Sequence, residues 1–134
     1  MAKIVDVEGI GPVYAAKLQE AGIAKTEALL EQGAMPKGRK ELAEKTGIAE
    51  SKILEWVNHV DLYRIKGVAS EYSDLLEEAG VDTVVELARR VAQNLYQKML
   101  EANVQKKLVR RPPTEAQVAD WIEQAKKLPR VVSY

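Results

Sequence analysis

The segment Val7-Glu8-Gly9-Ile10-Gly11-Pro12-Val13-Tyr14 decides the fold of this chain of 134 residues. Two glycines flank an apolar residue, and a proline follows where a helix can begin. Glycine permits the positive backbone φ angles of a tight turn, and proline suits the first turn of a helix because its missing N–H would be unpaired there. The segment therefore predicts a short hairpin that leads into a helix.

The same pattern returns 58 residues later, and Val7–Leu42 aligns with Ile65–Leu100. After seven extra residues in the second copy, the match resumes around Trp56 and Trp121 at an offset of 65. Identical pairs in the first alignment include Gly9/Gly67, Tyr14/Tyr72, Leu18/Leu76, Glu20/Glu78, Ala21/Ala79, Gly22/Gly80, Leu29/Leu87, Lys40/Lys98 and Leu42/Leu100. Such self-similarity indicates duplicated structural units. We expect repeats over residues 1–63 and 64–134 that pack as one domain, 1–134, with pseudo-twofold symmetry.

Each half has the pattern of four short helices, and no segment alternates like a strand, so the predicted fold class is all-α. In the first half, glycines and prolines mark the helix ends. The signals are a stop at Gly22, a cap at Thr26 for Glu27–Gln32, a stop at Gly33, a helix from Pro36 to Thr46 broken by Gly47, and a helix from Glu50 to Val60 with Ile53, Trp56, Val57 and Val60 inward.

The second half repeats these signals with two predicted capping boxes, at Thr83–Glu86 and Thr114–Gln117. The extra residues fall around Val104–Pro113, where we expect a basic loop. Trp56 and Trp121 stand among apolar residues at matching positions, so we expect both to be equivalent core anchors.

Composition limits the class of protein. Apolar residues make up 46% of the chain and charged residues 30%, which excludes a disordered chain. There are no cysteines, and the N-terminal residues lack the apolar run of a signal peptide. No stretch approaches the ~20 apolar residues that span a bilayer. We expect a soluble, cytoplasmic protein with no membrane partner.

The net charge is zero, but its distribution is uneven. Residues 95–134 hold eight bases against four acids, which leaves +4 there and −4 in residues 1–94. Such asymmetry can mark a side that faces a polyanion, or it can arise by chance on solvated helix faces.

The sequence offers little for catalysis. His59 is the only histidine, which disfavours zinc sites and Ser-His-Asp triads. There is no phosphate-binding Gly-Lys-Ser loop and no dinucleotide fingerprint. We expect no enzymatic activity, no cofactor and no metal, with His59 as a polar surface residue or a helix-dipole partner.

The segment Val7–Ala15 closely resembles the helix-hairpin-helix motif: an apolar residue, any residue, glycine, apolar, glycine, then a helix. This resemblance implies a hairpin whose backbone N–H groups hold a phosphate of a nucleic-acid backbone without reading its sequence. The alternative is that the glycines merely close a turn. The expected nucleic-acid-binding residues are Gly9, Ile10, Gly11, Val13 and Lys17 in and beside the hairpin, and Lys106, Lys107, Arg110 and Arg111 in the basic C-terminal region.

The chain departs from the DNA-binding version of this motif in two places. Val13 and Tyr14 follow Gly-Pro where binders often carry a base. In the second copy Ala69 replaces the second glycine and Glu71 adds an acid. We therefore expect the second hairpin to serve the architecture alone.

Another DNA-like pattern overlaps the fourth helix. Ala43, Gly47 and Ile53 have the spacing of a helix-turn-helix, although any two short helices packed across a glycine turn share it. The recognition helix would present Glu50, Ser51, Lys52, Glu55, Asn58 and His59. Two acids and one base complement the major groove poorly, so we favour the purely structural reading.

Nearly the whole chain is similar to a bacterial family of stand-alone, tandem helix-hairpin-helix proteins catalogued as a domain of unknown function. The resemblance lies in Glu8–Tyr14, Pro36–Ala43, Ile53–Asn58 and Lys127–Val132. It implies the fold and a bacterial cytoplasmic setting, and it brings no activity.

We therefore expect a non-enzymatic module that binds double-stranded DNA weakly and without sequence preference, or alternatively a protein–protein adaptor. A third class is an enzyme or ligand carrier with a site built between the two halves. A nucleic-acid binder should place its bases on one face, namely Lys17, Lys37, Arg39, Lys106, Lys107, Arg110 and Arg111. The sequence leaves the oligomeric state open.

Overall fold

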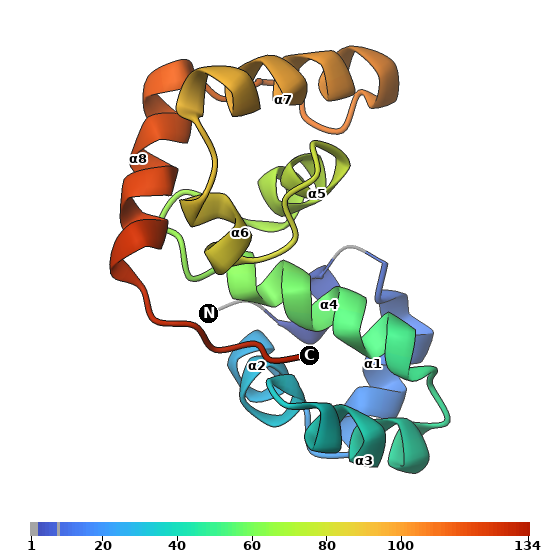
Figure 1. Ribbon diagram of the computed structural model, residues 1–134. Helices are drawn as coiled ribbons and strands as arrows, with labels where there is room; N and C mark the ends of the chain where they lie inside the picture. Colours follow the sequence, from blue (N-terminus) through green and yellow to red (C-terminus); the bar gives the residue numbers. More distant parts are fainter. Residues whose placement is uncertain (1–2, 8) are drawn as a thin grey trace. The chain divides into compact units, whose positions relative to one another are not determined.

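The computed structural model describes residues 3–7 and 9–134, so Glu8 of the predicted hairpin lies outside the described residues, as do Met1 and Ala2. The described part is all-helical and contains no strand beyond one bridge between Lys3 and Lys25. Its elements are the 3-10 helix η1 (Ile4–Asp6), α1 (Gly11–Glu20), α2 (Thr26–Gly33), α3 (Pro36–Thr46), α4 (Glu50–Leu62), α5 (Ser70–Glu78), α6 (Val84–Ala88), α7 (Ala92–Lys106) and α8 (Glu115–Lys127) (Figure 1). The predicted all-α class is confirmed.

These helices form two compact units. The first comprises Met1–Asp61 with Val131–Tyr134, and the second comprises Leu62–Arg130. The second repeat was expected to extend to residue 134, but the last four residues pack within the first unit. The second unit is thus inserted in the chain between α4 and this segment, and the single domain over 1–134 stays a prediction.

The two units repeat the same local backbone geometry. Gly9 and Gly67 have φ angles of +89° and +96°, and Gly22 and Gly80 have +90° and +94°. At the end of α1 the N–H of Ile23 donates to the Leu18 carbonyl at 2.8 Å, and its aligned counterpart in the second unit has the same length. The sequence repeat therefore corresponds to a repeated local structure.

A tyrosine–tryptophan pair forms the centre of each repeat. Trp56 and Trp121 are 1% and 2% exposed, as predicted. The ring of Tyr14 lies 5.1 Å from that of Trp56, and Tyr72 lies 5.2 Å from Trp121, both tilted. These contacts hold α1 against α4 and α5 against α8.

Several predicted helix ends are confirmed. Pro36 begins α3, and Gly47 follows it with a φ of +73°. Thr114 and Gln117 form both bonds of the predicted capping box at the start of α8. At Thr83–Glu86 the structure gives only one of the two bonds, from the Glu86 N–H to the Thr83 side chain.

Two predicted ends are wrong. Thr26 is the first residue of α2 rather than its cap, because its side chain is buried in the first unit. Helix α7 continues to Lys106, so the basic loop begins only at Lys107. The Asn103 side chain exchanges two hydrogen bonds with the Val109 backbone, at 3.0 and 3.2 Å, and so closes the loop against the end of α7.

None of the helices in residues 3–7 and 9–134 combines the length and apolarity that a bilayer crossing requires.

The turn between α2 and α3 depends on two glycines. A Cβ at Gly33 would lie 2.5 Å from Val57 Cγ2, and one at Gly38 would lie 1.9 Å from the Gln32 carbonyl oxygen. Both positions therefore allow a close approach that no other residue permits.

We predict that Gly38→Ala lowers the free energy of unfolding. Alanine in an open helical position would raise it by up to ~1 kcal/mol. Here the overpacking cost of about 1–3 kcal/mol exceeds that gain because the obstructing atom belongs to the backbone. Urea unfolding of the two proteins measures the difference. A variant more stable than the parent would show that the turn relaxes freely and would contradict the prediction.

Candidate nucleic-acid interface

The first hairpin is anchored by an apolar side chain and opens outward at a glycine. Ile10 is buried, and its N–H donates to the Val7 carbonyl at 3.1 Å. Gly11 begins α1 with a φ of +64°, and a Cβ built there would meet no described atom within 4 Å. The backbone at Gly11 therefore faces open space, whereas a Cβ at Gly9 would lie 3.5 Å from Trp56 Nε1.

Ile10, the residue before α1, provides no side-chain cap for this helix. The first N–H groups of a helix lack intrahelical acceptors and carry partial positive charge. Val13, in the first turn, is 69% exposed, so the described part of the unit leaves this end open. A small anion could approach these N–H groups directly.

A lysine from another helix lies over the ring of Tyr14, a residue in the first turn of α1. Lys52 on α4 places its Nζ 5.7 Å from the centroid of the Tyr14 ring, and its side chain is exposed. Lys17, by contrast, lies in the last turn of α1, roughly 9 Å along the axis from Gly11. In the sequence, Lys52 belongs to the helix-turn-helix pattern, where nothing indicates its contact with Tyr14. No local spacing could have revealed it, because Tyr14 and Lys52 are 38 positions apart.

The second hairpin repeats the buried apolar anchor, since Val68 is buried and its N–H donates to the Ile65 carbonyl at 3.1 Å, but it lacks the second glycine and the neighbouring lysine. Ala69 precedes α5 in extended conformation, and Glu71 adds an acid to the first turn. Gln117 aligns with Lys52 at the offset of 65, and its side chain is used in the capping box of α8. Gln124 also exchanges hydrogen bonds of 2.8 and 3.1 Å with the Lys66 backbone, which ties this hairpin to α8. This geometry agrees with the structural role expected for the second hairpin.

The predicted C-terminal bases lie in the second unit. Lys106 ends α7, Lys107 follows in left-handed conformation, and Arg110 and Arg111 lie in the loop; all four side chains are exposed. The Tyr72 hydroxyl donates to the Arg111 carbonyl at 2.9 Å, so this loop packs beside α5. These four residues and the predicted residues of the first hairpin are thus two separate sets, each within its own unit.

Two predicted surface residues are buried. Arg39 is 5% exposed and donates to carbonyl groups of its own unit, so its assignment to an exposed basic face was wrong. His59 is 3% exposed, so the expectation of a surface histidine was also wrong. Helix α4 directs His59 toward the core, so His59 is not available to contact DNA as the helix-turn-helix pattern would require.

A family model described as a domain of unknown function (DUF4332) matches residues 8–128. The chain belongs to the DUF4332 family. The predicted membership of a domain-of-unknown-function family is therefore confirmed. Comparison with curated proteins and with solved structures found no match for this DUF4332 chain.

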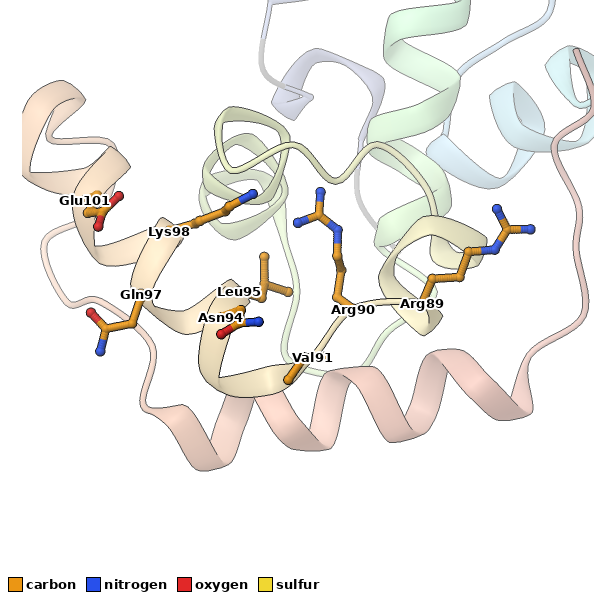
Figure 2. A pocket seen from close by; sticks show the side chains of 8 residues that line it. All are labelled: Arg89, Arg90, Val91, Asn94, Leu95, Gln97, Lys98 and Glu101. Atoms are coloured by element: carbon orange, nitrogen blue, oxygen red, sulfur yellow. The ribbon is translucent and has the colours of Figure 1, made fainter.

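The second unit of this DUF4332 chain also has a surface cavity of about 490 Å³ at the junction of α6 and α7. Figure 2 shows Arg90 and Lys98 directed toward the same space, whereas Arg89 points away. Arg90 donates to the Gly80 carbonyl at 2.8 Å and lies 3.8 Å from Glu86. Arg90 therefore links the α5–α6 turn to α6. Because its guanidinium already has these partners, it adds less positive charge to the cavity than an unpaired arginine would.

Proposed function

We propose that this chain is a non-enzymatic, tandem helix-hairpin-helix module that binds the phosphate backbone of double-stranded DNA through the first hairpin. The binding makes no use of base sequence, because helix N–H groups and a lysine contact phosphates rather than base edges.

One observation carries the proposal. The start of α1 has no side-chain cap from Ile10, opens onto free space at Gly11, and has the Lys52 ammonium group 5.7 Å from the centroid of the Tyr14 ring in its first turn. A phosphate there would receive hydrogen bonds from the first turn, attraction from the helix dipole, and a charge contact from Lys52. The second hairpin lacks this combination, which limits the number of contacts. Affinity is then modest, in the ~10⁻⁴–10⁻⁶ M range of non-specific binding.

A titration of fluorescently labelled duplex at ~50 mM salt tests the proposal. We expect binding that is indifferent to sequence and that weakens with salt, with roughly two or three phosphates neutralised and a log–log slope of about −2 to −3. Lys52→Glu should reduce affinity at least tenfold and flatten the slope by about one unit, since each lysine–phosphate contact contributes about one.

Lys126→Glu is the matched control, because Lys126 is exposed in the second unit and pairs with Glu123 across one helical turn. No binding at hundreds of micromolar protein, or equal loss in both variants, would reject the first hairpin as the site.

The second candidate function is a protein–protein adaptor. The observation that favours it lies in the same unit. There Arg39 and the Ala34 carbonyl bind the backbone of Ser133, a residue far along the sequence.

A further inference from the structure

Arg39 is a buried cation whose described acceptors are all backbone carbonyls. Its Nη1 donates to the carbonyls of Gly33 and Ala34, at 2.8 and 3.1 Å. Its Nη2 donates to the Ser133 carbonyl at 2.7 Å, across 94 residues of sequence. A buried guanidinium requires such bonds, because an unpaired charge inside a protein is costly.

The segment that Arg39 holds, Val131–Tyr134, is here called the return segment. It has no helical structure, and its Ser133 N–H donates to the Ala34 carbonyl at 2.8 Å. Ser133 therefore bonds the first unit through both its N–H and its carbonyl group. Val132 is buried, and the Tyr134 hydroxyl lies 3.4 Å from Asn58 Oδ1.

The groove that receives this segment is built by the first unit. The close approach of Gly33 to Val57 fixes the α2–α3 turn on α4, and Gly38 lets α3 start directly beside Gln32. This turn directs the carbonyls of residues 33 and 34 toward the Arg39 guanidinium. Arg39 donates two hydrogen bonds to carbonyls of the groove and one to a carbonyl of the segment. It therefore connects the groove with its occupant.

The contacts define what the groove recognises. Two bonds go to the main chain at position 133, where the Ser133 side chain contributes no described bond to the groove. One small apolar side chain is buried at position 132, and an aromatic hydroxyl contacts Asn58 at position 134. The return segment is connected to α8 through residues 128–130, which lie outside any helix.

We propose that this groove is a peptide-recognition site, and that the return segment is its exchangeable occupant. The site takes an extended peptide with a small apolar residue followed, two positions later, by tyrosine. Arg39 is its central anchor, because it donates to the main chain of whatever occupies the groove. This inference is independent of the nucleic-acid proposal, since none of the groove residues belongs to the first hairpin.

The test uses the full chain with one substitution, Val132→Cys, as a reporter, because the native chain has no cysteine to compete. A thiol reagent modifies the thiol at position 132 only when the segment leaves the groove. A free peptide with the sequence of residues 129–134 is then added. We expect it to displace the segment and to increase the labelling rate saturably. Arg39→Gln should raise the rate without peptide by roughly tenfold to a hundredfold, because a charge-assisted bond to the segment is lost.

Two further variants keep the result interpretable. Ser133→Pro removes the N–H that bonds Ala34 and leaves Arg39 in place, and it should also speed labelling. Val118→Cys reports on the buried core of the second unit, and its labelling should not respond to peptide or to either variant.

Two outcomes would overturn the proposal. If the thiol at position 132 reacts as slowly as the one at position 118 and ignores the peptide, the segment is a fixed part of the core. Fast labelling at position 132 that Arg39→Gln leaves unchanged would show that Arg39 does not anchor the occupant.

Discussion

Replacing either tryptophan by alanine should lower the free energy of unfolding by about 3–5 kcal/mol, the largest effect on stability that we expect from one substitution. Trp56 and Trp121 are almost fully buried, and each packs against a tyrosine at a ring separation near 5 Å. Truncation removes this contact and leaves a large cavity. It also removes the indole that lies against the hairpin glycine, where a Cβ at Gly67 would be 3.1 Å from Trp121 Nε1.

Urea or thermal unfolding followed by circular dichroism measures both variants. Val104→Ala is the control, because the Val104 side chain on α7 is 77% exposed. It should change stability by ~0.5 kcal/mol or less. The two tryptophan variants should lose similar amounts, since their surroundings match. A loss below ~1 kcal/mol in either one would show that the repeats do not depend on equivalent anchors.

Gly11→Asp should abolish duplex binding while the protein stays folded. The backbone at Gly11 is left-handed, a region that aspartate tolerates better than most residues, and the space around it is open. A carboxylate at a helix start is favourable for the helix and would occupy the position that we assign to the phosphate. Binding and stability should therefore change independently, with affinity falling by more than tenfold at ~50 mM salt.

The matched control is Gly22→Asp, which makes the same charge change at the other end of α1. Gly22 also has a positive φ, and a Cβ there meets nothing described within 4 Å. Ala69→Asp makes a parallel change at the second hairpin and should leave affinity nearly unaltered. If all three variants bind alike, the first hairpin is not the phosphate site. If Gly11→Asp unfolds the chain, the assigned geometry of the helix start is wrong.

The successful fold predictions share a physical basis in short-range signals. Gly9, Gly22 and Gly47 have the positive φ angles that their positions in the pattern require. The Thr114–Gln117 capping box needs only residues three apart, and it forms as predicted. Trp56 and Trp121 are buried because apolar residues at helical spacing must face a core. Repetition strengthened the predictions at Gly9, Gly22 and the two tryptophans, because each of these residues has an identical counterpart in the other copy.

The predictions that failed concern side chains whose surroundings are formed by residues far away in the sequence. Arg39 has the local surroundings of an exposed base in a charged helix, yet a carbonyl 94 residues away makes it a buried anchor. Lys52 lies over the Tyr14 ring because α4 packs on α1 through the Tyr14–Trp56 pair. His59 is buried because α4 turns it inward. The return segment packs with the first unit although it follows the second unit in the sequence.

By itself, the sequence determined the helical class, the internal repeat, most helix ends and the aromatic anchors of each unit. These depend on glycine and proline backbone preferences and on hydrophobic periodicity, both of which act over a few residues. The tertiary structure alone decided which charges are free and which are buried. It brings Lys52 over the ring of Tyr14, pairs Arg90 with the Gly80 carbonyl, and places Arg39 on the return segment. A charged side chain is long, and whether it meets water or a carbonyl depends on segments that only folding brings near it.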